Sequence, residues 1–234
     1  MSGSGIWDNR APQREHLVKP GMGFSAELFD FRQDVGNSLK YMAALTVEEF
    51  TNPPAASANA IKTSVASSTS AQSYSGAALN GAVGGATMAI PRNITATTAG
   101  GTPADVPATA TITGKDVDGN TITETLTLSQ TAATVAGVKM FASVTQIDMP
   151  AGQGTAGTLT FGTGLLLGLR ITPKSRAGGV VAVREVVDGA LVTTGTLSSA
   201  ATNAPHGAYT PATAPDGSHD YAVYYEYDVT TVPL

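Results

Sequence analysis

The sequence predicts an all-β protein, namely an antiparallel β-sandwich of immunoglobulin-like or jelly-roll-like type with an extended N-terminal arm. Three observations favour this class. Apolar and polar residues alternate with a period of two over much of the chain after residue 87. Asp-Gly and Gly-Asn steps, which suit tight turns, separate two of these runs. Threonine, whose β-branched side chain favours extended backbone, occurs 32 times among 234 residues.

The first 60 residues differ from the rest, because they combine aromatic side chains with several prolines. Some of these aromatic residues follow a rough helical spacing, which predicts an arm with one or two short helical turns. An arm with few neighbours of its own must bury its rings elsewhere. We therefore expect Trp7, Phe24, Phe29 and Phe31 to bind a partner surface, on an adjacent subunit or on the protein's own domain. An ordinary core strand or helix is the alternative interpretation.

Residues 61–79 are rich in alanine, serine and threonine, a composition typical of a linker or a surface loop. The sequence therefore predicts three parts: an arm over 1–60, a linker over 61–79 and a β-sandwich domain over 80–234. Within the third part, two hairpins are expected. The first joins residues 108–114 to 121–128, and the second turns at Asp188-Gly189.

Charged residues make up only 13% of the chain, and the formal net charge is -5. Nucleic-acid binding therefore has no electrostatic support. A surface so poor in charge is typical of one that copies of the chain or other subunits cover. Threonine at alternate strand positions gives a sheet face that is polar but neutral, and such a face can pack against a partner without the cost of desolvating charges.

Three short patterns resemble functional motifs, and each fails on its context. Gly152–Gly157 has the spacing of a dinucleotide-binding loop, but a strand rather than a helix is expected to follow it. Asp116–Asn120 resembles the start of a calcium loop, but its glycine is at the fourth position and Thr127 stands where a glutamate is needed. Ser218–Asp220 places the residue types of a hydrolase triad side by side, whereas triad residues normally converge from separate elements. We therefore expect no enzymatic activity and no catalytic, cofactor-binding or metal-binding residues.

No apolar run approaches the length of a membrane span, and the first residues lack a basic start followed by an apolar stretch. The chain also contains no cysteine, so neither disulfides nor thiolate metal sites are expected. These features favour synthesis in a cytoplasm, without membrane partners.

Several stretches between residues 111 and 225 resemble a pattern found in small β-rich virion proteins of tailed bacteriophages. They are residues 111–126, 138–147, 154–164, 167–169, 207–217 and 221–225. The resemblance implies a head decoration or cement protein with a β-sandwich fold, which binds the outside of the assembled head and locks neighbouring capsid subunits together. It implies the major capsid protein as a partner and no catalytic residues, and it does not extend over the first 60 residues.

We therefore expect a non-enzymatic decoration protein on the outer surface of a virion head, most simply a homotrimer. A tail, collar or head-fibre component is one alternative. A carbohydrate-binding adhesion module is another, in which Tyr224, Tyr225 and Tyr227 would stack against sugar rings.

Overall fold

The computed structural model describes residues 44–176, 179–180, 182–192 and 195–227. In this part of the chain the protein is an antiparallel β-sandwich, which confirms the predicted fold class. All pairings between the described strands are antiparallel, and the only helical elements among the described residues are short 3₁₀ turns. None of the helices described is long and apolar enough to cross a membrane.

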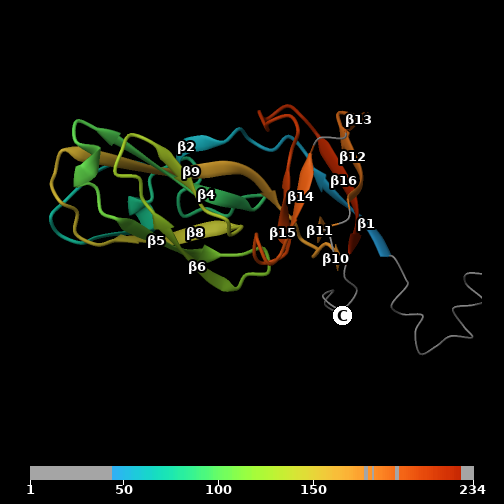
Figure 1. Ribbon diagram of the computed structural model, residues 1–234, viewed down its shortest axis with the longest axis horizontal. Helices are drawn as coiled ribbons and strands as arrows, with labels where there is room; N and C mark the ends of the chain where they lie inside the picture. Colours follow the sequence, from blue (N-terminus) through green and yellow to red (C-terminus); the bar gives the residue numbers. More distant parts are fainter. Residues whose placement is uncertain (1–43, 177–178, 181, 193–194, 228–234) are drawn as a thin grey trace, which may run out of the picture. The chain divides into compact units, whose positions relative to one another are not determined.

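The strands and 3₁₀ turns (Figure 1) are β1 (Ala44–Phe50), β2 (Ser57–Ala66), β3 (Gln72–Ser75), η2 (Gly76–Ala78), β4 (Arg92–Gly100), η3 (Pro103–Asp105), β5 (Thr109–Lys115), β6 (Thr121–Thr127), β7 (Thr134–Ala136), β8 (Ser143–Met149), β9 (Gly157–Gly168), β10 (Ser175–Arg176), β11 (Gly179–Val180), β12 (Ala182–Val187), β13 (Ala190–Val192), β14 (Thr196–Ser199), β15 (Gly207–Thr210) and β16 (Tyr221–Tyr227).

Two sheets form the sandwich around the main core. One has the order β14-β15-β9-β4-β7, with β2 also paired to β9, and the other has the order β3-β8-β5-β6. In Figure 1, β2, β9 and β4 lie above β5, β8 and β6. Between them lie fully buried side chains from both sheets, including Ile61, Ile94, Ile112, Ile147 and Phe161. Each such side chain contributes about 1.5–3 kcal/mol by leaving water.

A third sheet, with the order β1-β16-β12-β13, forms a second core with the far end of β9 and with β15. Aromatic rings dominate this core. The ring of Phe50 stacks on that of Tyr209, with centroids 6.1 Å apart, and Tyr221 meets Tyr209 edge to face. Leu167 of β9 is fully buried in the same cluster, so the 12-residue strand β9 contributes to both cores.

Both predicted hairpins are confirmed. β5 and β6 pair over their whole length up to Lys115 opposite Thr121, and Gly119 in the connecting turn has a φ of +81°. β12 and β13 join through Asp188 and Gly189, with φ values of 49° and 79°. Two successive positive φ values are those of a type I′ turn, which suits the twist of a two-residue hairpin.

The predicted division of the chain is wrong in two places. Residues 61–79, expected as a linker, contain most of β2 together with β3 and η2, and β2 and β3 pair with β9 and β8. β1 and the start of β2 lie within the expected arm, and the compact unit begins at Ala44. Alanine, serine and threonine suit a tightly packed strand as well as a loop, so composition alone did not distinguish the two.

The rest of the expected arm, including the candidate partner-binding residues Trp7, Phe24, Phe29 and Phe31, lies outside the described residues. Their predicted role stays a prediction.

Candidate functional site

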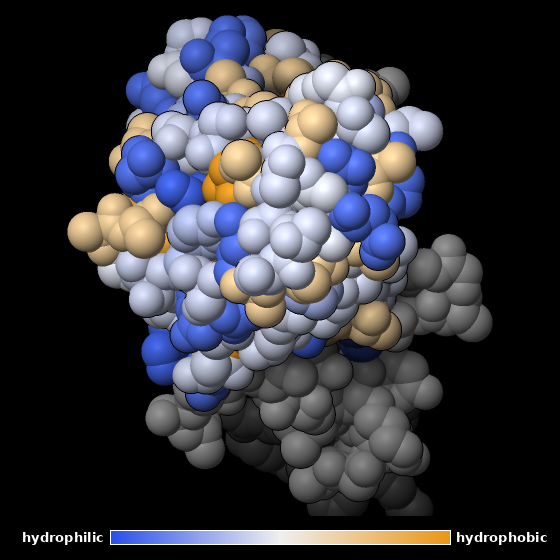
Figure 2. All heavy atoms as spheres, turned by 90° about the vertical axis from the view of Figure 1, so that its left-hand side faces the viewer, coloured by the Kyte–Doolittle hydropathy of each residue, from blue (hydrophilic) through white to orange (hydrophobic). Residues whose placement is uncertain are grey.

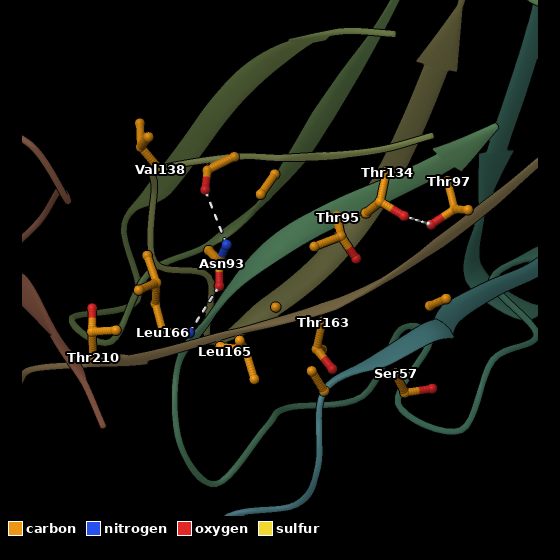
Figure 3. A pocket seen from close by; sticks show the side chains of 15 residues that line it. Ser57, Asn93, Thr95, Thr97, Thr134, Val138, Thr163, Leu165, Leu166 and Thr210 are labelled. Carbon is orange, nitrogen blue, oxygen red and sulfur yellow. Dashed lines mark hydrogen bonds between the residues drawn. The ribbon is translucent and has the colours of Figure 1, made fainter. Parts of the chain in front are cut away.

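A groove of about 580 Å³ opens on the outer face of the sheet formed by β4, β7 and β9 (Figure 3). Strand alternation on β4 creates this face, because Ile94 and Ala96 point into the core while Asn93, Thr95 and Thr97 line the groove. Fifteen of the described residues line it: one serine, five threonines, one asparagine, three alanines, two glycines, one valine and two leucines. None of them is ionisable, so a partner can cover the groove without stripping water from a charge.

The floor and one wall of the groove depend on close backbone packing. The hydroxyl groups of Thr97 on β4 and Thr134 on β7 lie 2.8 Å apart, which ties the edge strand to its neighbour. At the start of β2, the chain passes directly over Gly162 of β9. A Cβ atom at position 162 would lie 1.7 Å from the carbonyl oxygen of Ser57, so only glycine allows this crossing.

Asn93 holds two walls of the groove together. Its side chain is buried, its Nδ2 donates a hydrogen bond to the carbonyl oxygen of Gly137 at 3.1 Å, and its Oδ1 accepts one from the backbone N–H of Leu166 at 3.2 Å (Figure 3). Gly164 provides the room for this amide, because a Cβ atom there would lie 2.3 Å from the Asn93 Oδ1. The hydrogen bonds of the Asn93 side chain therefore fix the groove before any partner arrives.

Val138 and Leu165 are two exposed apolar side chains that line the groove. They expose 49% and 48% of their surfaces, the two largest values among the large apolar residues described. The backbone of Val138 is fixed on both sides: its N–H donates to a carboxylate oxygen of Glu124 at 2.6 Å, and its carbonyl accepts from Nδ2 of Asn203 at 2.7 Å. An exposed apolar side chain on a rigid backbone loses little conformational entropy when it binds.

The side chain of Arg92 fixes the backbone next to the groove. Its side chain is 3% exposed, Nε and Nη2 both donate to the carbonyl oxygen of Gly164, and Nη1 donates to that of Pro54 at 2.9 Å. Burial lowers the pKa of Arg92 to about 10, so the guanidinium stays charged at neutral pH. Backbone carbonyls compensate this charge, and the contacts join β4 to β9 and to the segment before β2.

Another buried ionisable group lies on β1, away from the groove. Glu48 is 7% exposed, and its Oε1 lies 3.8 Å from Nε of Arg170, whose side chain is 64% exposed. Burial raises the pKa of Glu48, and the nearby Arg170 offsets part of this effect. Because the Arg170 side chain is exposed to water, its charge compensates the buried carboxylate of Glu48 only weakly.

The dinucleotide-like segment Gly152–Gly157 is a loop that leads into β9, as the sequence analysis expected, and no helix begins there. Asp105 organises it: its backbone carbonyl accepts from Gln153 N at 2.9 Å, and its Oδ2 accepts from Ala156 N at 2.9 Å. These contacts are those of a structural loop.

The calcium-like segment forms the predicted turn. Asp116 is buried, and its Oδ1 accepts hydrogen bonds from the backbone N–H groups of Asp118 at 3.0 Å and Asn120 at 2.9 Å. The carboxylate thus stabilises its own turn.

The segment Ser218–Asp220 does not have triad geometry. His219 Nδ1 lies 2.6 Å from Asp188 Oδ2 and its Nε2 lies 3.5 Å from Asp216 Oδ2, while the Ser218 hydroxyl donates to Asp216. Hydrogen bonding to Asp188 is the main cause that raises the pKa of His219. The histidine therefore bridges two carboxylates and does not face the serine hydroxyl.

The three tyrosines considered for sugar stacking do not share a surface. Tyr225 is fully buried and donates its hydroxyl hydrogen to the carbonyl of Ile171 at 2.8 Å, and Tyr227 packs against the second core. Of the three, Tyr224 alone is largely exposed, at 40%. The alternation along β16 explains this result, because Tyr224 points away from the face that carries Tyr221 and Tyr225.

The groove was not predicted from the sequence. One signal for part of it was present, since Asn93 to Thr97 alternates polar and apolar residues, as a strand with a neutral outer face does. The remaining walls come from β2, β7 and β9, and nothing local in those segments identifies them.

Comparison with known proteins adds no assignment, because no family model, curated protein or solved structure matches the chain. In the described ranges, no group of three or more histidine, cysteine, aspartate or glutamate side chains is placed to hold a metal ion.

Proposed function

We propose that this protein is a non-enzymatic structural protein of a tailed-phage virion, which decorates the assembled head and stabilises it by bridging neighbouring capsid subunits. The observation that carries the proposal is the groove of fifteen residues without an ionisable group, whose walls are fixed by the buried side chain of Asn93. A preformed, neutral and partly apolar surface suits contact with another protein. The phage assignment itself rests on the sequence resemblance.

The wider surface supports the same interpretation. Figure 2 shows one face of the molecule on which pale residues of intermediate hydropathy predominate, with hydrophilic residues in scattered groups. Four threonines of β6 are exposed along one edge of the second sheet: Thr121, Thr123, Thr125 and Thr127. Such a surface is water-compatible before assembly and costs little to cover afterwards.

The proposed mechanism is mechanical. Packaged DNA pushes head subunits apart, and a decoration protein resists by contacting several of them at once. Because each added contact acts at high effective concentration, modest individual contacts combine into tight binding. The expected partners are the major capsid protein and other copies of this chain, and the expected location is the outer surface of the head.

The test is whether this protein binds to purified heads that come from the same phage and lack the protein. We expect cosedimentation that saturates at an icosahedral stoichiometry, together with protection of the heads against heat. Binding to isolated tails at a few copies per particle would support the tail or collar alternative and overturn the proposal. Binding to neither structure would overturn it as well.

A further inference from the structure

We infer that His219 acts as a pH-dependent latch, which joins the segment before β16 to the β12–β13 turn when its imidazole is protonated and releases Asp216 when that proton is lost. The latch consists of the two contacts that the His219 ring makes with Asp188 and Asp216. The inference stands on this cluster of side chains and is independent of the proposed function.

Two carboxylates face the two nitrogens of one imidazole ring. His219 Nδ1 lies 2.6 Å from Oδ2 of Asp188, in the turn between β12 and β13. Its Nε2 lies 3.5 Å from Oδ2 of Asp216, in the segment before β16. The ring of Tyr221 packs edge to face against the imidazole, with centroids 6.3 Å apart. The ring is therefore held between two negative groups that belong to different connections of the fold.

The number of hydrogens on the ring decides how many of these contacts are attractive. An imidazolium carries a hydrogen on each nitrogen and can face both carboxylates, whereas a neutral imidazole carries only one. The shorter contact, to Asp188, keeps the remaining hydrogen. The lone pair of Nε2 then faces the Asp216 carboxylate, so this contact changes from attractive to repulsive.

His206 provides an internal comparison, because it also contacts an aspartate of a hairpin turn. Its Nε2 lies 2.8 Å from Oδ2 of Asp118 in the β5–β6 turn, and its Nδ1 lies 2.8 Å from the hydroxyl oxygen of Thr172. A hydroxyl group can either donate or accept a hydrogen bond. Both contacts of His206 are therefore satisfied whether its ring is charged or neutral, and only the pair of carboxylates around His219 makes a latch.

The charges around His219 set the direction of the switch. Hydrogen bonding to Asp188 is the main cause that raises the pKa of His219 above 6.5. The backbone N–H of Asp220 is the main cause that lowers the pKa of Asp188, and the hydroxyl of Ser218 is the main cause that lowers the pKa of Asp216. Both carboxylates therefore stay charged while the imidazole titrates. The latch is closed below the folded-state pKa of His219 and opens as the pH rises through that value.

Two further titratable groups lie next to the ring in the described part of the chain. Asp220 accepts a hydrogen bond on a carboxylate oxygen from the backbone N–H of Asn52 at 2.9 Å, and the Tyr221 hydroxyl donates to the carbonyl of Thr213 at 3.0 Å. Burial is the main cause that raises the pKa of Tyr221 above 10. Tyr221 therefore stays neutral over the range in which His219 titrates.

Release of Asp216 weakens the segment before β16 at a defined place. The turn itself stays joined to Asp220, because Asp188 N–H donates to the Asp220 carbonyl at 2.9 Å and Asp188 Oδ1 accepts from Asp220 N–H at 2.7 Å. Gly217, next to Asp216, donates its N–H to the carbonyl of Pro53 at 3.0 Å. This hydrogen bond is the one that we expect to open more often when the latch is released.

The test is amide hydrogen exchange of the full chain, measured by NMR at several pH values between about 5 and 9 and expressed as protection factors, which remove the intrinsic pH dependence of exchange. We expect the protection factor of the Gly217 amide to fall at least about threefold as the pH rises through the pKa of His219, which titration of the ring signals gives in the same sample. The amide of Gly168, which donates to the carbonyl of Pro91 at 2.8 Å, is the reference and should show no such step.

Asp216→Asn is the decisive variant, because it removes the charge that faces Nε2 and keeps an oxygen that can accept from the N–H of Ser218. His219 should still titrate in this variant, but the protection of Gly217 should no longer depend on pH. His219→Gln should give the low protection of the open latch at every pH. The matched control is His206→Gln, which should leave the pH dependence at Gly217 as it is in wild type.

A step in protection that Asp216→Asn and His219→Gln abolish, and that His206→Gln retains, would support the inference. Constant protection of Gly217 across the titration of His219 would overturn it. A pH dependence that survives in Asp216→Asn, or that disappears in His206→Gln, would overturn it as well. None of these results bears on binding to heads, so the proposed function is tested separately.

Discussion

Replacement of Asn93 by alanine tests how the groove is held. The substitution removes a buried hydrogen bond of 3.1 Å to the carbonyl of Gly137 and a part-buried one of 3.2 Å from the N–H of Leu166, and it leaves both backbone groups without these partners. Each orphaned group costs about 1–3 kcal/mol. Because nearby main chain can relax, we expect a total loss of about 2–4 kcal/mol, a large part of the 5–15 kcal/mol typical of a domain.

Urea denaturation of wild-type and Asn93→Ala protein measures this loss, with an unchanged m-value as evidence that the folded state stays compact. Asn93→Asp provides a sharper comparison, because it keeps an acceptor for Leu166 N–H but places a buried carboxylate against the carbonyl of Gly137. It should therefore cost more than alanine at neutral pH and less at acidic pH. The matched control is Asn59→Ala at an exposed position. A loss below about 1 kcal/mol for Asn93→Ala would refute the assigned role.

Three further predictions concern other parts of the chain. Burial raises the pKa of Glu48 above 4.5, so the native state loses stability as pH rises above that value. Glu48→Gln should therefore unfold at a higher temperature than wild type at pH 7, and this difference in unfolding temperature should disappear near pH 4. An equal difference at both pH values would contradict the prediction. Asp188 raises the pKa of His219 above 6.5, so this contact adds stability at acidic pH that is lost as pH rises through the folded-state pKa. NMR titration should give a lower pKa for His219 in the Asp188→Asn variant than in wild type, and an unchanged pKa would contradict the prediction. Deletion of residues 1–43 should leave a folded sandwich that protects heads less well, whereas deletion of residues 1–50 also removes β1 and should unfold the second core. Circular dichroism measures the folding of both variants, and heat challenge of heads measures their protection. Full protection by the variant that lacks residues 1–43 would refute the predicted role of the arm.

Strand periodicity and turn chemistry are local properties, so the sequence was sufficient for the fold class and for both hairpins. Asp188-Gly189 supplies two positive φ values at adjacent positions, and alternation on β6 separates exposed Thr125 from buried Leu126. The same reasoning failed over residues 61–79, where small residues mask a strand. Ile61 and Val65 are buried there against β9, about 95 residues later in the chain, and composition carries no information on such a pairing.

The groove could not be predicted because its geometry depends on distant contacts. Asn93 joins Gly137 to Leu166, which are separated from it by 44 and 73 residues in the chain. Gly162 has no side chain and therefore leaves room for the backbone of Ser57 to pass over β9. What the composition did predict was the character of the surface. An excess of threonine and a shortage of charge are reflected in the groove, whose described lining contains no ionisable residue.

The most direct test of the account is an electron cryomicroscopy map of the intact particle in which this chain is located. We predict that Val138, Leu165 and the threonines of the groove lie against density from a neighbouring polypeptide in every copy on the head. Copies whose groove faces open solvent throughout the particle, with their contacts made elsewhere, would contradict it.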